Sequence, residues 1–424
     1  MEYRQAVSEL FYLQKYAIKL GLDNIAALTR YLNYPHKNYP VIHIAGTNGK
    51  GSTAFFTAAV LQAMGLKAGL FTSPHLQDFR ERIRVNGKVI DEASVVRFWQ
   101  NVKEEVLKRK ATFFDTTTAM GLDYFSREEV DVAVIETGLG GRLDSTNIVN
   151  SEIVAITPID FDHQKQLGDT LEKIAYEKAG IIKENSAVFC AKQQTEALRI
   201  LKSAKTKKFY YLPDYIRVVV KSASLDKMEF DIYDDLNDTI LKNIVSRQVG
   251  VYQAENIALA YFMARYFLSQ HGINFDKNLF KEQIKKILWP GRLQKISSNP
   301  DIIFDVSHNP AGIKTTLNYL SDKTERDKLH ILLGLVEDKA YNEIVDFISL
   351  KCDAVYLTEP DTHRKLDGTL LLQEFRKRNK EALFIENARE AYRIAKSRLK
   401  EKDTLLVIGS HYLIGAIISE IKNN

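Results

Sequence analysis

The feature that most constrains the fold of this chain is a glycine-rich run between an apolar stretch and a helical pattern. Residues 41–45 predict a short buried strand, residues 53–64 predict an amphipathic helix, and between them stands Gly46-Thr47-Asn48-Gly49-Lys50-Gly51-Ser52. The glycines allow backbone N–H groups to converge on phosphate oxygens, while the helix N-terminus and Lys50 add positive charge. The run therefore predicts a binding site for a nucleoside triphosphate.

The spacing within this run differs from the common Walker pattern. That pattern places four residues between its first glycine and Gly-Lys, and Ser or Thr follows the lysine directly. Here only Thr47 and Asn48 separate Gly46 from Gly49, and Gly51 stands before the serine. The departure favours a small group of ATP-driven ligases over nucleotide hydrolases in general.

Length and composition predict a two-domain enzyme. A chain of 424 residues, 45% of them hydrophobic, exceeds what one core usually serves. The net charge is +5 without blocks of like charge, so neither a nucleic-acid partner nor a membrane partner is indicated. Cys190 and Cys352 lack metal-type spacing and are expected to be free thiols in a reducing compartment. With no apolar segment after Met1, these features predict a cytoplasmic location.

Apolar strand-like runs alternate with helical patterns along most of the sequence, which is typical of parallel α/β architecture. Strands are predicted at 41–45, 68–71, 132–135 and 153–157. Each is followed by polar or glycine-containing residues, and ligands bind beyond the carboxyl ends of the strands in an open parallel sheet. The four loops that follow these strands are therefore expected to meet at one site.

Other patterns predict the remaining organisation of the chain. Asn86-Gly87 indicates a hairpin with a type I′ turn at 82–90, and alternating residues indicate a small antiparallel excursion at 209–240, before a helix at 253–269. After Pro290-Gly291 the alternation of strands and helices restarts, with strands at 302–304, 331–333, 354–357 and 405–408. We therefore expect a larger domain at 1–290 and a smaller Rossmann-like α/β domain at 291–424.

A carboxylate at the end of one predicted strand points to a metal ion. Glu136 closes the strand at 132–135, where a buried charge is costly unless it meets a cation. Mg²⁺ bound to nucleotide phosphates is a suitable partner, with the hydroxyl of Ser52 as another oxygen ligand. A pair with Arg142 is the alternative, and the phosphate loop favours the metal.

His163 and Lys178 lie beyond a further strand, in Asp160-Phe161-Asp162-His163 and Ala175-Tyr176-Glu177-Lys178. An isolated histidine after a strand is more often structural than a metal ligand, but His163 falls at the edge of the sheet where the site is expected. On the residue pattern alone, Lys178 is an ordinary solvated helix residue.

Several motifs occur in one order along the chain: the run at 46–52, Ser73-Pro74-His75-Leu76, Glu81-Arg82-Ile83, Glu136-Thr137-Gly138-Leu139-Gly140-Gly141-Arg142 and Trp289-Pro290-Gly291-Arg292-Leu293. Together they resemble the folylpolyglutamate synthase/dihydrofolate synthase family of the Mur ligase superfamily, over nearly the whole chain. The resemblance implies a P-loop Mur-ligase-type, ATP-binding ligase domain at 1–290 and a glutamate-ligase domain at 291–424.

The resemblance also implies an activity. L-Glutamate would be joined to a pteroate or folate carboxylate in an ATP-dependent reaction that passes through an acyl phosphate and releases ADP and phosphate. Dihydropteroate and reduced folates or their polyglutamates are the implied acceptors, so a bifunctional enzyme is expected. The implied cofactors are ATP and two Mg²⁺ ions. The protein is expected to be a monomer that acts on small molecules.

Residue by residue, the resemblance implies nucleotide and metal roles. Lys50 and the loop at 46–52 would hold the β- and γ-phosphates. The two Mg²⁺ ions would rest on Ser52, Ser73, Glu136, His163 and Lys178. Lys178 corresponds to a lysine that the family carries as a carbamate. The implied catalytic set is Lys50, His163, Lys178, Arg292 and His308.

Further roles are implied nearer the second domain. Asn256 resembles the adenine contact, Arg292 the linker arginine that reaches the γ-phosphate, and Asp305 a nucleotide contact. His308 and Ser410 resemble residues near the incoming glutamate. A helix cap, a strand-end cap and a turn residue are the alternative interpretations of Asn256, Asp305 and Ser410. Arg292 is preferred among these because its planar fork matches phosphate geometry.

The acceptor site is implied at two segments, 113–118 and 73–82, the second of which would form a flexible loop. The implied substrate-binding residues are Ser73, Pro74, His75, Arg82, Phe114, Thr118, His308 and Ser410. Aromatic side chains can stack on a pterin, but Phe113 and Phe114 fit a hydrophobic core at least as well.

Two departures from the family pattern concern the nucleotide and glutamate geometry. Val306-Ser307 stands where the family usually has Gly-Ala, and Tyr252 stands where a histidine is common. The nearest alternative function is a cell-wall Mur ligase that adds an amino acid to a UDP-linked precursor, but residues 1–45 are too few for its separate UDP-binding domain. A P-loop GTPase or motor is disfavoured by the loop spacing and the linker arginine.

Overall fold

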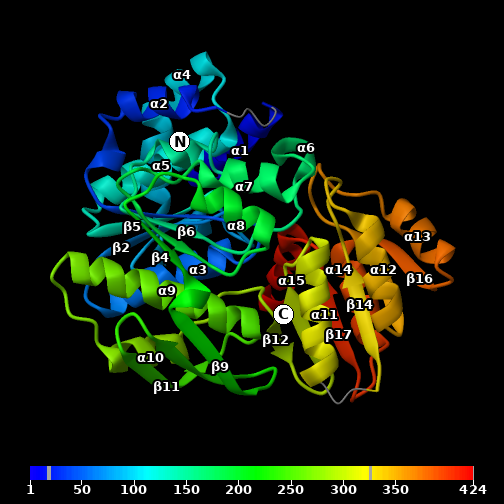
Figure 1. The fold of residues 1–424 in the computed structure, drawn as a ribbon. Helices are drawn as coiled ribbons and strands as arrows, with labels where there is room; N and C mark the ends of the chain where they lie inside the picture. Colours follow the sequence, from blue (N-terminus) through cyan, green and yellow to red (C-terminus); the bar gives the residue numbers. More distant parts are fainter. Residues whose placement is uncertain (17–20, 324–326, 424) are drawn as a thin grey trace.

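Two mainly parallel sheets, each covered by helices, make up most of the chain and lie side by side (Figure 1). The structure is a computed structural model that describes residues 1–16, 21–323 and 327–423. The strand order is β4-β3-β2-β5-β1-β6-β7-β8 in the larger sheet and β12-β13-β17-β14-β15-β16 in the smaller one. This mixed α/β architecture confirms the predicted fold class.

The larger sheet is built around β1, which pairs in parallel with β5 and β6. Apart from His43 in β1 and Glu136 at the end of β5, these three strands are apolar, and every residue in them is buried, as expected for the centre of a parallel sheet. The predicted hairpin is confirmed, because β3 and β4 are antiparallel and both turn residues, Asn86 and Gly87, have positive φ. The strands are β1 (Val41–Ala45), β2 (Ala68–Phe71), β3 (Ile83–Val85), β4 (Lys88–Val89), β5 (Val132–Glu136), β6 (Ile153–Ile156), β7 (Ala187–Cys190) and β8 (Lys208–Tyr211).

Helix α3 (Lys50–Ala63) starts inside the glycine-rich run, three residues before the predicted start. The expectation of an amphipathic helix is wrong, because the residues from Gly51 to Leu61 are buried apart from Phe55. The reason is tertiary: α3 packs against the sheet on one side and against α9 (Val251–Gln270) on another. The other helices of this part are α1 (Tyr3–Tyr12), α2 (Asp23–Tyr31), α4 (Glu92–Arg109), α5 (Phe113–Arg127), α6 (Gln164–Leu167), α7 (Leu171–Ala179), α8 (Thr195–Lys202) and α10 (Lys277–Lys286).

A three-stranded antiparallel sheet, drawn in green at the bottom of Figure 1, precedes α9. It consists of β9 (Ile216–Ala223), β10 (Met228–Asp234) and β11 (Thr239–Ser246). The predicted antiparallel excursion is confirmed there, but its start is wrong, because Phe209 belongs to β8, which pairs in parallel with β7. The pattern of alternation is the same in an edge strand of either sheet, so it does not distinguish the two.

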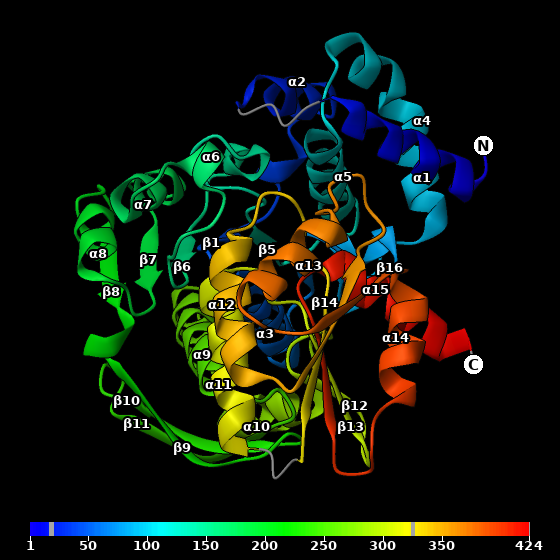
Figure 2. The same cartoon turned by 90° about the vertical axis from the view of Figure 1, so that its right-hand side faces the viewer.

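The second sheet contains the four strands predicted after Pro290-Gly291 and two that were not predicted. Figure 2 shows α11 and α12 on one side of this sheet and α14 and α15 on the other. The unpredicted strands are at the two edges: β12 consists mostly of half-exposed polar residues, and β16 has a partly exposed apolar run that ends in two exposed polar residues. The elements are β12 (Gln294–Ser297), β13 (Asp301–Asp305), α11 (Pro310–Lys323), β14 (Leu329–Leu333), α12 (Tyr341–Lys351), β15 (Ala354–Glu359), α13 (Gly368–Lys377), β16 (Ala382–Asn387), α14 (Ala388–Ser397), β17 (Thr404–Ile408) and α15 (His411–Asn423).

The last helix touches the loop that follows β2 at a position without a side chain. A Cβ atom built on Gly415 of α15 would lie 1.8 Å from the carbonyl oxygen of Leu76. Both cysteines are buried free thiols, as predicted. Within the part of the chain that the structure describes, no helix has both the length and the apolar character needed to cross a bilayer.

Candidate active site

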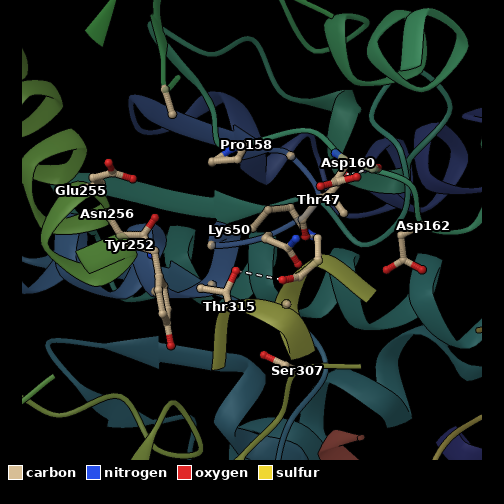
Figure 3. A pocket seen from close by; sticks show the side chains of 18 of the residues that line it. Thr47, Lys50, Pro158, Asp160, Asp162, Tyr252, Glu255, Asn256, Ser307 and Thr315 are labelled. Carbon is tan, nitrogen blue, oxygen red and sulfur yellow. Dashed lines mark hydrogen bonds between the residues drawn. The ribbon is translucent and has the colours of Figure 1, made fainter. Parts of the chain in front are cut away.

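A cavity of about 680 Å³ lies where the phosphate loop faces the second sheet. Figure 3 shows Lys50 and Thr47 beside Asp160 and Pro158, with Ser307 of the second sheet on the opposite side. The cavity brings together most of the residues predicted from the sequence. These are the loop at 46–52, Ser73, Pro74, Glu136, His163, Lys178, Asn256, Arg292, Asp305 and His308.

Two glycines of the phosphate loop are required by the close approach of neighbouring elements. Gly46 has φ +150°, and a Cβ there would lie 1.9 Å from the hydroxyl of Thr157. Gly49 has φ +89°, and its Cβ would lie 2.6 Å from Oδ1 of Asn256. Any other residue would meet both strain and a clash at these positions.

Not every backbone amide of the loop is directed to a ligand. The N–H groups of Thr47 and Asn48 both donate to the carbonyl oxygen of Pro158, at 3.0 and 3.2 Å, and so fix the loop to the end of β6. The donors that remain for an anion are those of the first turn of α3, which have no acceptor within a helix. Lys50 lies at this turn, and its Nζ donates to the carbonyl oxygen of Thr47 at 3.2 Å.

Glu136 lies at the end of β5 and is buried beside the loop. One of its oxygens, Oε2, accepts a hydrogen bond of 3.0 Å from the backbone N–H of Ser73. Burial raises the pKa of Glu136, while Lys50 and Arg292 oppose that rise. The alternative partner predicted from the sequence is not used, because Arg142 instead forms an ion pair of 2.9 Å with Glu177.

His163 and Asp162 follow β6 and face residues of the second sheet. The ring Nδ1 of His163 lies 2.9 Å from Asp338, and burial lowers the pKa of this histidine. Asp162 lies 2.7 Å from Nζ of Lys339 and 3.4 Å from Nε2 of His308. Although burial alone would raise its pKa, His308, His163 and Lys339 hold the pKa of Asp162 well below the usual range. The carboxylate therefore joins the two halves of the molecule electrostatically.

Lys178 is buried, contrary to the solvated residue that the sequence pattern indicates. It extends from α7 toward the phosphate loop, where its Nζ donates to the carbonyl oxygen of Gly46 at 2.6 Å. Burial, followed by the charge of Lys50, lowers the pKa of Lys178 to about 7. A helix in the second layer of the fold thus places an amine with perturbed acidity next to the phosphate site.

The donors in the cavity fit Mg²⁺ only if phosphate oxygens complete its shell. In the described ranges, no group of three or more His, Cys, Asp or Glu side chains is placed to hold a metal. Mg²⁺ commonly takes one or two carboxylates together with phosphate oxygens and water. The buried carboxylate of Glu136 next to a phosphate loop meets that requirement, with Ser52, Ser73 and His163 on the same cavity wall.

A second cavity of about 360 Å³ adjoins the first and contains His75, Arg84 and Trp289. The two cavities share the residues Gly51, Ser73, Pro74, Glu136, Arg292 and His411. The shared residues therefore form a junction through which a group in one cavity can reach a group in the other. Among them, His411 was not predicted, because no local motif distinguishes it from any other residue at a helix start.

Four predicted substrate residues, Arg82, Phe114, Thr118 and Ser410, do not line either cavity. Nε of Arg82 donates to the ring of His75 at 2.8 Å, and the Phe114 ring packs closely against Gly138. Thr118 is buried and its hydroxyl has no hydrogen-bond partner among the described residues. The Ser410 hydroxyl accepts a hydrogen bond of 3.0 Å from the N–H of Leu413, as a helix cap does.

The alternative interpretations of Asn256 and Asp305 have different outcomes. Asn256 lies inside α9 and is no helix cap; its side-chain amide donates to Gln253 at 3.1 Å. Asp305 does act at a strand end, where it accepts hydrogen bonds from the N–H groups of Leu293 and Ser307, at 2.8 and 2.9 Å. Both residues nevertheless line the cavity, so a nucleotide contact stays compatible with each position.

The linker that carries Arg292 is fixed by a buried glutamine that the sequence did not predict. The Gln248 side chain accepts a hydrogen bond of 2.8 Å from the N–H of Trp289 and donates one of 2.6 Å to the carbonyl oxygen of Arg292. Gln248 is fully buried, so both ends of its amide depend on these partners. One side chain thus holds the linker backbone on both sides of Pro290-Gly291.

Replacing Gln248 with leucine is expected to lower the free energy of unfolding by about 2–4 kcal/mol, because two partly buried backbone groups lose their partners. Urea denaturation followed by circular dichroism measures the change. The matched control is Gln5→Leu on the exposed side of α1, which is expected to change stability by less than about 0.5 kcal/mol. Equal effects of the two substitutions would contradict this role of Gln248.

Comparison with known proteins agrees with this geometry. The Mur ligase middle domain matches residues 44–264, and the glutamate ligase domain of Mur ligases matches residues 291–411. A folylpolyglutamate synthase of Lacticaseibacillus casei is 33% identical over 376 residues, which cover 86% of this chain and 87% of the relative. A probable bifunctional folylpolyglutamate synthase/dihydropteroate synthase of Haloferax volcanii is 31% identical over 98% of this chain, which spans only 50% of that relative.

Solved structures agree with the same assignment. The folylpolyglutamate synthase of Mycobacterium tuberculosis, described as complexed with ADP, superposes with a TM-score of 0.92 at 27% identity and with full coverage of both chains. The likeness therefore covers both sheets and the linker between them. The middle-domain match spans more than half of the chain, and the relative from Lacticaseibacillus casei is 33% identical over 86% of it, so this protein belongs to the folylpolyglutamate synthase/dihydrofolate synthase family of the Mur ligase superfamily.

Proposed function

We propose that this chain joins L-glutamate to dihydropteroate and to reduced folates or their polyglutamates, with conversion of ATP to ADP and phosphate. As a member of its family, the protein is an ATP-dependent ligase that forms an amide bond. The observation that carries the proposal is the junction of two cavities at Glu136 and Arg292, beside the phosphate loop. One cavity is suited to the nucleotide and the other to the acceptor carboxylate.

In the first step, an oxygen of the acceptor carboxylate attacks the γ-phosphorus of ATP, and the bond from that phosphorus to the β,γ-bridging oxygen breaks. Transfer of this kind depends on positioning and on cations that stabilise charge on the phosphoryl oxygens. Lys50 and the first turn of α3 are placed to hold the phosphates, and Arg292 brings a guanidinium to the junction. ADP leaves, and the acceptor carries an acyl phosphate.

In the second step, the uncharged amino group of glutamate attacks the acyl carbon. A tetrahedral intermediate forms, the bond to the phosphate oxygen breaks, and the proton lost by the nitrogen goes to the departing phosphate. His308 faces the phosphate cavity from the second sheet, so the glutamate amine is expected to approach from that side. The proposed glutamate contacts are His308 and Ser410, and the proposed pteroate contacts lie at 73–82 and at Phe114 and Thr118.

We propose that two Mg²⁺ ions bind at Ser52, Ser73, Glu136, His163 and a carbamylated Lys178, where they would supply positive charge to the transferring phosphoryl group. The support for the carbamate is that Lys178 is buried next to the loop and that its pKa is lowered to about 7, which increases the share of neutral amine. Only the neutral amine reacts with CO₂. Asn256 and Asp305 are the proposed base-side and linker-side nucleotide contacts.

The proposed domain boundary follows residue 290, and the start of the glutamate ligase domain match at residue 291 supports it. The larger domain at 1–290 would bind ATP, and the domain at 291–424 would bind glutamate. A monomer and a cytoplasmic location stay predictions from the sequence.

The acceptor range is tested by measuring ADP release from ATP and L-glutamate in the presence of dihydropteroate, tetrahydrofolate or a UDP-muramyl precursor. The proposal expects glutamate-dependent ADP release with both pterin acceptors and none with the precursor. Release with only one pterin would reject bifunctionality. Release with the UDP-muramyl compound alone would assign the chain to cell-wall synthesis instead.

A further inference from the structure

The guanidinium of Arg292 lies at the junction of the two cavities and has two hydrogen-bond partners, the carbonyl oxygen of the adjacent Gly291, at 3.3 Å from Nη1, and one imidazole. Nη2 of Arg292 lies 3.2 Å from Nε2 of His411, the first residue of α15. The two residues are 119 positions apart, so this contact joins the linker to the last helix. Both side chains line both cavities.

The contact with a guanidinium determines the protonation state and the tautomer of His411. A guanidinium has N–H donors and no acceptor, so Nε2 of His411 must accept and the ring proton must lie on Nδ1. A protonated ring could not accept, and it would face the arginine with like charge. Burial above all, and then the charge of Arg292, lower the pKa of His411 well below its usual value, which agrees with the neutral ring.

Because the ring of His411 is neutral, it does not neutralise the positive charge of Arg292, which can then interact with an anion in the cavity. Among the described residues, no carboxylate forms an ion pair with Arg292 within 4.0 Å. Asp305, the carboxylate whose charge acts most strongly on Arg292, already accepts from the backbone of Leu293 and Ser307 and from the hydroxyl of Thr316. A carboxylate in the place of His411 would orient the guanidinium equally well, but it would compete with phosphate for its charge.

We propose that His411 is a positioning residue for Arg292, a neutral acceptor that directs the guanidinium to the transferred phosphoryl group without neutralising it. The inference rests on the proposed function of Arg292. It explains why the fold brings an uncharged acceptor, and not an acid, to a partly buried arginine. His411 touches neither the nucleotide nor the acceptor in this scheme, and it acts through Arg292 alone.

Three substitutions separate orientation from charge. In His411→Leu the acceptor is lost, in His411→Gln a neutral acceptor is kept, and in His411→Glu an acceptor with negative charge is introduced. Calorimetry on the full chain measures the affinities for ADP and for AMPPCP, which differ by the γ-phosphate group. Thermal unfolding reports whether each variant is folded.

We expect His411→Leu and His411→Glu to weaken AMPPCP binding about tenfold while ADP binding changes by less than about threefold. His411→Gln is expected to stay within about threefold of the parent for both ligands, and kcat is expected to fall for the leucine and glutamate variants only. Equal affinities of the glutamine and glutamate variants for AMPPCP would overturn the inference. The comparison of the glutamine and glutamate variants also tests the inference if the leucine variant fails to fold.

Arg292→Ala separates this inference from the function on which it rests. If Arg292→Ala keeps the parent's preference for AMPPCP over ADP, the proposed role of Arg292 fails. If Arg292→Ala loses that preference and His411→Leu retains it, only the role of His411 is overturned. The double variant that combines Arg292→Ala with His411→Leu is expected to bind AMPPCP as Arg292→Ala alone does, because the guanidinium that His411 positions is then absent.

Discussion

Replacing Lys178 with methionine is expected to reduce glutamate-dependent ADP release by roughly 10²–10³-fold, the effect of removing one preorganised electrostatic group. The amine of Lys178 is buried and donates a hydrogen bond to the carbonyl oxygen of Gly46. Methionine fills a similar volume but supplies neither the hydrogen bond nor the charge. The measurement is the steady-state rate with saturating ATP, glutamate and acceptor. The matched control is Lys173→Met on the same helix, whose amine pairs with Asp169 at the surface. Parental activity of Lys178→Met would reject the role.

The proposed carbamate on Lys178 can be tested independently of this substitution. Enzyme depleted of CO₂ is expected to lose activity and to regain it when bicarbonate is added, whereas Lys178→Met is expected not to respond. Mass spectrometry under non-denaturing conditions is expected to find the mass of one CO₂ on the parent and none on the variant. A parent enzyme that is indifferent to bicarbonate would reject the carbamate while leaving a role for the free amine.

Replacing Lys50 with methionine is expected to weaken ATP binding and to lower kcat/KM for ATP by roughly 10²–10³-fold, because a full positive charge next to the transferring phosphoryl group is lost. Lys50 is the first residue of α3, and only the helix N-terminus remains at the loop in the variant. Initial rates over a range of ATP concentrations measure the change.

The control for Lys50 is Lys67→Met, at the opposite end of α3, where the lysine pairs with Glu128 at the surface. This control removes the same charge from the protein without approaching the cavity, so its kcat/KM is expected to stay within about twofold of the parent. If Lys50→Met has parental kcat/KM for ATP, the run at 46–52 is not the phosphate-binding loop.

The strands that were predicted differ from those that were not in how clearly their own residue pattern indicates a strand. The central strands β1, β5 and β6 are apolar apart from His43 and Glu136, because both faces are covered, and their pattern can be recognised without knowing which strands they pair with. The edge strands β12 and β16 mix apolar with polar residues and have no buried residue, which equally fits a loop. Their strand form depends on pairing with β13 and β15.

The same distinction applies to the site. Glu136 and His163 were predictable because each follows a strand, and the ends of parallel strands meet by topology. Gln248 and His411 were not, since their roles arise from contacts with Arg292 across 44 and 119 positions of the chain. Lys178 was predicted only through the resemblance to the family, because its burial against Gly46 is a product of how α7 packs.

The contact between α15 and the loop after β2 has a steric consequence for the whole molecule. At Gly415 the space that a methyl group would fill is taken by the carbonyl oxygen of Leu76, at 1.8 Å. The junction residues Ser73 and Pro74 belong to that loop, and His411 and Arg292 approach it from the side of α15. With any larger residue at 415, the last helix and this loop could not come so close, so the absence of a side chain at this position allows α15 to close one side of the junction.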